Sequence, residues 1–89
     1  MKEIELKAWI LRGSQRRAIF QIIEDNLIPA QMYEKARKIN SKVTRNNVSD
    51  ILKEFRENKL IECINPEEKK GRIYKLTNKG KKLKQIIFK

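Results

Sequence analysis

The side chains with the greatest capacity for directed hydrogen bonding gather in one short stretch, TRNNVSDILK, which covers residues 44–53. The candidates for ligand contact in this stretch are Thr44, Arg45, Asn46, Asn47, Ser49 and Lys53. Asparagine can form two hydrogen bonds to adenine, arginine can do the same with guanine, and lysine neutralises phosphate. The stretch therefore has the chemistry to bind the base edges and backbone of a nucleic acid. The alternative interpretation is a hydrated helix surface that binds nothing.

The apolar residues of the same region predict the helix that presents these side chains. They recur at the i, i+3, i+4 and i+7 positions of one helix face, namely Val48, Ile51, Leu52 and Phe55. Thr44 is a good N-cap, and Val43 and Val48 are spaced as a hydrophobic staple around it. Helix propensity weakens at Asn58, where we expect the chain to turn. The polar residues then occupy the face opposite the buried one.

The segments before this helix are also predicted to be helical. Residues 30–38 have apolar side chains at helical spacing, and a polar turn follows them. An earlier helix is expected to begin with Ser14 as its N-cap and to run to about Asp25 or Asn26. For residues 4–11 two interpretations stay open, a short helix or an extended arm.

After the turn at Asn58 the hydrophobic period changes from helix to strand. Leu60–Ile64 and Arg72–Leu76 are predicted strands, and a polar loop of residues 65–71 joins them as a hairpin. Thr77 can cap a final helix, whose first turn is weakened by Gly80. Two strands cannot bury a core alone, so they must lie against the helices.

These elements predict a mainly α fold with a small β-hairpin. The 89 residues suffice for one domain, residues 1–89, and leave no room for a second core. Two helices joined by a tight turn, the second polar on its outer face, are typical of a helix-turn-helix.

Three stretches resemble known proteins. Residues 43–62, VTRNNVSDILKEFRENKLIE, resemble the recognition helix and following strand of winged-helix transcription regulators related to the MarR and ArsR families. Residues 65–80, NPEEKKGRIYKLTNKG, resemble their wing and its exit, and residues 12–17, RGSQRR, resemble small archaeal winged-helix proteins. The resemblance covers about residues 12–84. It implies the order α-α-turn-α-β-wing-β-α, with the helix-turn-helix at about 30–58 and the wing at about 60–76.

The sequence departs from the family pattern in two places. The turn within residues 36–43 is about two residues longer than in the shortest versions of the motif, so the recognition helix can sit at a different angle. Many relatives have a glycine at the end of that helix, where this chain has Lys59. We therefore expect the preceding Asn58 to adopt the left-handed conformation instead.

The charge is strongly positive and unevenly distributed. Lysine and arginine number 22 against 11 acidic residues, which leaves a net charge of +11. Residues 69–89 contain nine basic residues and no acidic one, and residues 12–17 and 35–45 are likewise basic without an acid. A dense cation favours a polyanion such as nucleic acid. The alternative is a lysine-rich composition that reflects genome bias or solubility.

Further basic residues are candidates for backbone contact. In the resemblance the wing lies along the DNA backbone or in the minor groove, which assigns that role to Lys69, Lys70 and Arg72. The alternative is a flexible loop whose lysines only keep it soluble. Arg16 and Arg17 begin a predicted helix, where they can meet a phosphate near the helix N-terminus.

Several functional classes lack their residues in this chain. There is no histidine and one cysteine, Cys63, so we expect no enzyme, no metal site, no disulfide and no cofactor. Cys63 is expected as a small buried residue in a strand, with redox sensing as the alternative. The longest apolar run is residues 8–11 and residues 1–7 do not resemble a signal peptide, so we expect no membrane partner and a cytoplasmic location. The sequence contains no recognisable binding site for a small-molecule effector.

The expected function is that of a sequence-specific transcription regulator that binds double-stranded DNA. The terminal segments, 1–12 and 77–89, are apolar enough to join two copies as a homodimer, or alternatively to complete the core of a monomer. The runner-up is an architectural or protein-interaction module within a transcription, replication or repair assembly. RNA binding is a variant with the same charge requirement.

Overall fold

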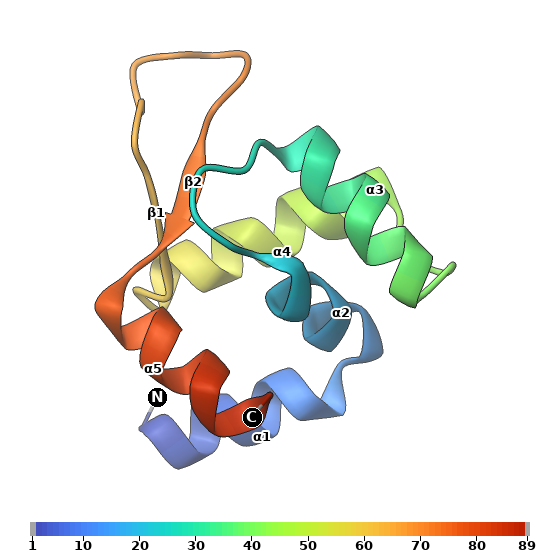
Figure 1. Cartoon of the computed structure of the whole chain (residues 1–89), viewed down its shortest axis with the longest axis vertical. Helices are drawn as coiled ribbons and strands as arrows, with labels where there is room; N and C mark the ends of the chain where they lie inside the picture. Colours follow the sequence, from blue (N-terminus) through green and yellow to red (C-terminus); the bar gives the residue numbers. More distant parts are fainter. Residues whose placement is uncertain (1, 89) are drawn as a thin grey trace.

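The computed structural model describes residues 2–88, which form five helices and one two-stranded antiparallel hairpin (Figure 1). Along the chain the elements are α1 Glu3–Arg12, α2 Ser14–Ile22, α3 Pro29–Ile39, α4 Arg45–Glu57, β1 Ile61–Cys63, β2 Tyr74–Leu76 and α5 Asn78–Ile87. The prediction of a mainly α fold with a small hairpin is therefore confirmed. The hairpin loop projects beyond the helices, and the molecule measures 33 × 28 × 20 Å.

One apolar cluster holds the elements together. Every helix and both strands contribute buried side chains to it. Its centre is aromatic: the Phe20 and Phe55 rings meet edge to face with centroids 5.4 Å apart, and Trp9 packs edge to face on Phe55 at 5.8 Å. Edge-to-face pairs at these separations stabilise a core beyond the area they bury.

The first segment is a helix, which decides between the two interpretations of residues 4–11. Leu6 and Ile10 of α1 are buried among the side chains of the same chain, as is Leu83 of α5. The two terminal helices also contact each other, as Figure 1 shows at the bottom of the molecule. Much of the apolar surface expected at a dimer contact is thus already used within one copy.

The predicted limits of α2 were wrong at both ends. Gly13, not Ser14, is the N-cap, and the Ser14 hydroxyl donates to Gln15 Oε1 rather than capping the helix. The helix ends at Ile22 because the next residues serve the hairpin. Leu27 exchanges two backbone hydrogen bonds with Tyr74, of 3.0 and 2.8 Å. Asn26, with φ of 62°, makes the turn that brings Leu27 there.

The α3–α4 unit follows the prediction closely. Pro29 is the first residue of α3, where a missing N–H costs nothing. The cap predicted at Thr44 is confirmed: the Asn47 N–H donates to Thr44 Oγ1 and the Thr44 N–H donates to Asn47 Oδ1, each at 3.1 Å. Val43 and Val48 on either side of the cap are both buried.

The end of α4 differs from the prediction in one residue. Lys59 adopts the left-handed conformation with φ of 63°, whereas Asn58 has φ of −91°. The Asn58 side chain instead donates to Glu54 O at 2.9 Å, which keeps it on the helix. Lys59 is held in place from a distant part of the chain, because the Thr77 hydroxyl donates to its carbonyl oxygen at 2.6 Å.

The strands are shorter than predicted. Pairing is limited to Ile61 with Leu76, Glu62 with Lys75, and Cys63 with Tyr74. Beyond Cys63 one further backbone bond forms, from the Ile64 N–H to Ile73 O at 2.8 Å, before the loop opens.

The last helix begins as predicted and depends on its glycine. Thr77 Oγ1 accepts a hydrogen bond from the Gly80 N–H at 3.0 Å. A Cβ at Gly80 would clash with the backbone carbonyl oxygen of Leu60 and meet Leu76 Cδ2 at 3.1 Å. Gly80 therefore allows α5 to approach the chain entering β1. Within residues 2–88, no helix has both the length and the apolar character needed to cross a bilayer.

Candidate nucleic-acid interface

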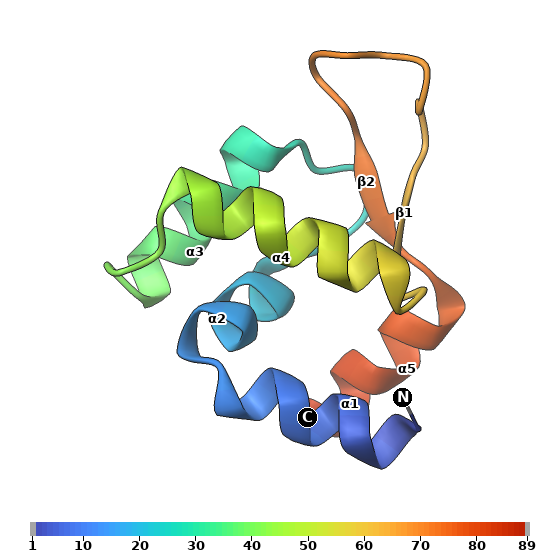
Figure 2. The ribbon, with the colours of Figure 1, turned by 180° about the vertical axis from the view of Figure 1, so that it is seen from behind.

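The polar face predicted on α4 points away from the core. Arg45, Asn46, Ser49 and Lys53 are exposed, and Figure 2 shows α4 lying across the surface of the molecule. The opposite face of the helix is fully used in packing, since Val48, Ile51, Leu52 and Phe55 are buried. The helix is thus fixed by one face while the other is free for a ligand.

Two of the predicted contact residues have a structural task. Thr44 and Asn47 exchange the two hydrogen bonds that cap α4, so their side-chain oxygens already have partners. Asn47 is also half-buried. The structure therefore divides the six candidates of this stretch into two capping residues and four exposed ones.

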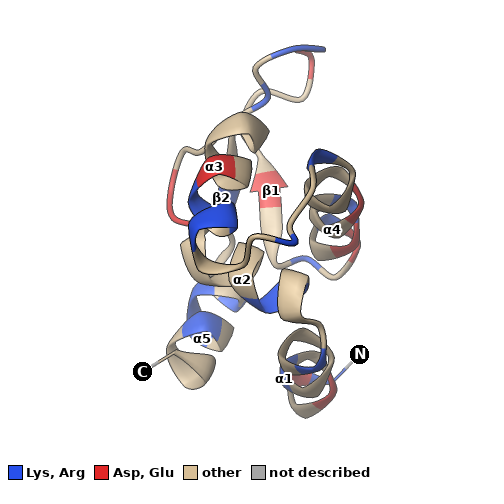
Figure 3. Cartoon of the chain, turned by 90° about the vertical axis from the view of Figure 1, so that its right-hand side faces the viewer, with Lys and Arg blue, Asp and Glu red and all other residues tan. Residues whose placement is uncertain are grey.

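The α4 helix itself carries no excess of positive charge. Its three basic residues, Arg45, Lys53 and Arg56, are matched by three acidic ones, Asp50, Glu54 and Glu57. Figure 3 shows acidic residues along the outer side of this helix. The positive charge of the molecule must therefore act from other elements.

One concentration of basic residues lies at the end of α3 and in the turn that follows. It comprises Lys35, Arg37, Lys38, Lys42 and Arg45. Each of these side chains is exposed, and Glu34 is the acidic residue among them. Figure 3 shows basic residues along α3, beside one acidic segment of that helix. This cluster adjoins the N-terminal end of α4, where the exposed amide side chains are.

Tyr33 links α3 to α4 within this cluster. The Cζ atom of Arg45 lies 4.6 Å from the centroid of the Tyr33 ring, and that of Arg37 lies 5.8 Å from it. Arg37 Nη1 also donates to Tyr33 Oη at 3.0 Å. Arg45, which was predicted to reach base edges, thus rests on α3. Sequence reasoning did not single out Tyr33. The available signal was its i, i+4 spacing from Arg37 on one helix face.

The hairpin loop is ordered by a residue that sequence reasoning passed over. Asn65 Oδ1 accepts a hydrogen bond from the Ile73 N–H at 2.7 Å, and Asn65 Nδ2 donates to Gly71 O at 3.2 Å. Gly71 has φ of 66°, a conformation that glycine adopts without strain. The available signal was an asparagine at the end of a strand and before a proline, a combination that favours turns.

The three basic residues predicted in the loop are not equivalent. Lys69 and Lys70 are exposed at the projecting end of the hairpin. Arg72 is half-buried, and its Nε donates to Glu68 O at 2.7 Å. Arg72 therefore closes the loop on itself. The two lysines are its free cations, and the exposed Glu67 and Glu68 oppose them.

Arg16 and Arg17 are likewise separated by the structure. Arg16 Nε donates to Trp9 O at 3.0 Å, and its Cζ lies 4.8 Å from the Trp9 ring centroid. Arg16 thus joins the end of α1 to the start of α2, while Arg17 is exposed. Within residues 2–88, no hydrogen bond or ion pair connects these arginines, the α4 face and the hairpin loop to one another.

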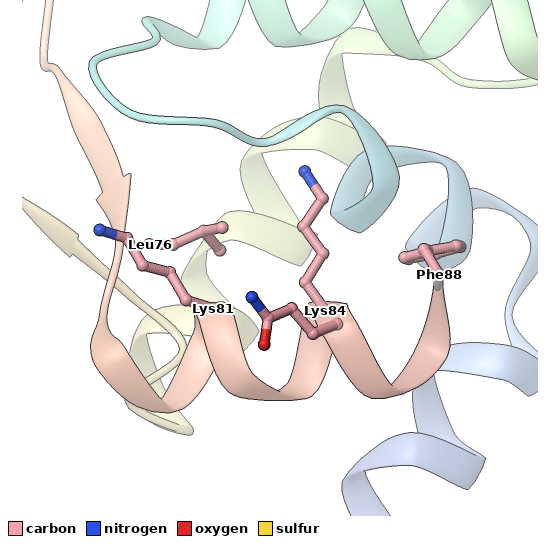
Figure 4. Close-up of a pocket in the computed structure, with 5 residues that line it drawn as sticks. Leu76, Lys81, Lys84 and Phe88 are labelled. Atoms are coloured by element: carbon pink, nitrogen blue, oxygen red, sulfur yellow. The ribbon is translucent and has the colours of Figure 1, made fainter.

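A separate hollow lies beside α5 on the other side of the molecule (Figure 4). Its lining residues are Leu76, Lys81, Lys84, Gln85 and Phe88. Lys84 points across it and donates from Nζ to Ile23 O, while Lys81 pairs with Asp25 at 3.8 Å. Burial lowers the pKa of Lys84, and the nearby Glu24 carboxylate partly offsets that effect. These lysines tie α5 to the segment after α2.

The part of the chain that the structure describes contains no group of three or more His, Cys, Asp or Glu side chains placed to hold a metal ion. Cys63 is a free thiol in β1, the predicted strand, but it is half-buried rather than buried, and its Sγ donates to Asn65 Oδ1 at 3.6 Å. Comparison with family models, curated proteins and solved structures finds no match to this chain.

Proposed function

We propose that this chain is a winged helix-turn-helix protein that binds double-stranded DNA and regulates transcription in a sequence-specific manner. In this proposal α3 and α4 are the helix-turn-helix, α4 is the recognition helix and the β1–β2 hairpin is the wing. The observation that carries the proposal is the free polar face of α4, a capped helix of 13 residues packed by its other face and followed at once by a projecting hairpin. An α-helix with its side chains is about 10–12 Å across, which fits the major groove.

The proposed contacts are those that the structure leaves exposed. Asn46 and Ser49 face base edges, and Lys53 reaches a phosphate. Lys69 and Lys70 place the wing on the backbone or in the minor groove. The net charge of +11 supports this arrangement, because phosphate neutralisation supplies most of the affinity for duplex DNA.

The test is selection and sequencing of random duplex DNA fragments that bind the purified protein at about physiological salt. A consensus sequence is expected, together with its loss in the double variant Asn46→Ala, Ser49→Ala. Lys82→Ala is the control, because Lys82 is exposed on α5 and pairs with Glu3 of α1, 3.8 Å away, rather than with any residue of α4. Recovery of duplexes without any consensus, falling steeply with salt, would contradict sequence-specific regulation.

The charge balance on α4 favours a second candidate function, an architectural or protein-interaction module. A helix with three acidic residues on and beside its outer face suits a protein surface of mixed charge. Under this candidate, changes at Asn46 and Ser49 leave DNA binding unaltered. DNA binding by the double variant, compared with that of the Lys82→Ala control, therefore distinguishes the two functions.

We further propose that the protein acts as a homodimer, joined along α1. Ile4 is 76 % exposed and Leu11 is 40 % exposed, and with the exposed Ala8 they occupy the i, i+7 and i+4 positions of one stripe. Sedimentation equilibrium should report a dimer for the wild type and a monomer for Ile4→Glu. A monomeric wild type at all accessible concentrations would remove the dimer from the proposal.

A further inference from the structure

Two arginines from different helices share one aromatic ring. Arg37 comes from the last turns of α3 and Arg45 is the first residue of α4, yet both guanidinium groups lie over Tyr33. Cation–π contact attracts the face of a guanidinium group to the ring. The N–H groups on its edge are then still available to bind oxygen atoms.

The charge of these two arginines is not cancelled within the protein. Within residues 2–88 the ion pairs are formed by Lys75, Lys81 and Lys82, and neither arginine takes part in one. Glu34 lines the same hollow, but within residues 2–88 it makes no ion pair with them. An anion would find two positively charged donors here without displacing an existing carboxylate.

The surface is concave on both sides of the Tyr33–Arg45 contact. One hollow is lined by Tyr33, Glu34, Arg37, Lys38 and Arg45, and the other by Pro29, Ala30, Tyr33, Arg45, Val48 and Ser49. Arg45 therefore borders both hollows at the N-terminal end of α4. The partial positive charge of a helix N-terminus adds to the attraction for an anion.

We propose that Tyr33, Arg37 and Arg45 form a binding site for one phosphate group of a nucleic-acid backbone. The inference rests on the proposed function and changes one assignment within it, since Arg45 binds phosphate and not a base edge. Arginine binds phosphate through two parallel N–H bonds, which suits the two guanidinium groups. Tyr33 Oη accepts from Arg37, so its own proton is free to be donated to a phosphate oxygen. Tyr33 is thus both a ligand and the residue that positions Arg45.

The experiment compares Arg45→Ala with Asn46→Ala on two duplexes, the selected sequence and a scrambled one. Loss of a phosphate contact should weaken binding to both duplexes alike, by about tenfold, and reduce the slope of log affinity against log salt by about one. Loss of the base contact at Asn46 should affect the selected duplex alone. Arg45→Ala acting only on the selected duplex, or having no effect, would overturn the proposal while leaving DNA binding itself established.

Tyr33 variants test the positioning role. Tyr33→Phe keeps the ring under Arg45, so the slope of log affinity against log salt should stay that of the wild type. The affinity should fall only by the loss of one hydroxyl hydrogen bond. Tyr33→Leu removes the ring and should reproduce the lower slope of Arg45→Ala, with circular dichroism confirming that the helices persist. Equal slopes for the Leu variant and the wild type would contradict the role of the ring.

A titration with inorganic pyrophosphate separates this site from the proposed function. The arginine Nε–H resonances of Arg37 and Arg45 should shift before those of Arg16, Arg17 and Arg72, and Arg45→Ala should abolish the shift at Arg37. This outcome supports the site even for a protein that fails to bind duplex DNA. Parallel shifts of all five arginines would mean non-specific ion association and would overturn the proposal.

Discussion

At the scale of single residues, the structure gives several side chains tasks that their type alone does not reveal. Arg16 and Arg72 have the charge of phosphate ligands, yet each donates to a nearby backbone carbonyl oxygen. Asn65 orders the hairpin loop through two hydrogen bonds to its other end. The residues left free for a partner are therefore fewer than the basic composition suggests.

Gly80 provides a test whose sign depends on tertiary contact. Helix propensity alone predicts that Gly80→Ala stabilises the protein by up to about 1 kcal/mol. The structure predicts the opposite, a loss of about 1–3 kcal/mol, because the new methyl group would clash with the backbone at Leu60. Urea denaturation measures the change in the free energy of unfolding, and Lys82→Ala on the exposed side of α5 is the control. An increase in stability would show that α5 does not approach Leu60 so closely.

At the scale of elements, α4 combines a strong local start with a distant end. Its N-terminus depends on Thr44, Asn47 and the two valines, all within a few residues of one another. Its C-terminus depends on Thr77, far along the chain, which bonds to Lys59 O. Local sequence patterns predicted the N-terminal cap, and they placed the left-handed residue after the helix at Asn58 instead of Lys59.

The two reciprocal hydrogen bonds between Thr44 and Asn47 should contribute to the stability of the fold rather than to ligand binding. Thr44→Ala removes an N-cap acceptor and should lower the free energy of unfolding by about 1 kcal/mol. Asn47→Ala breaks the reciprocal bond, so the double variant should cost less than the sum of the two single changes. Thermal denaturation of the three variants measures this coupling. Strictly additive losses would mean that the two bonds act independently.

At the scale of the whole molecule, charge is separated from the proposed recognition face. The α4 helix is balanced, and the hairpin loop is nearly so, since Glu67 and Glu68 oppose its three basic residues. The α3 end and α5 contain the excess of lysine and arginine. Long-range attraction of a polyanion would thus come from these elements, and α4 would supply the specific contacts.

Lys84 is one of the basic residues of α5, and its altered pKa should make the free energy of unfolding depend on pH. Burial lowers its pKa in the folded state below the ordinary lysine value of 10.5, so the folded protein binds fewer protons than the unfolded chain in the interval below 10.5. Stability should therefore rise with pH as the group deprotonates in the folded state, and level off above 10.5. The difference in unfolding free energy between the wild type and Lys84→Met, followed from neutral to alkaline pH, isolates this effect. A difference that does not change with pH would contradict it.

Local sequence patterns were sufficient for the features that depend on neighbours along the chain. These features are the helices over residues 30–38 and 45–57, the caps at Thr44 and Thr77, the hairpin and the net charge, because helical period and capping act over a few residues. The tertiary structure alone decided where α2 ends and why residue 80 is glycine. It also decided that Arg45 rests on Tyr33. Each of these depends on an atom that folding brings from another element, and no local pattern encodes such a partner.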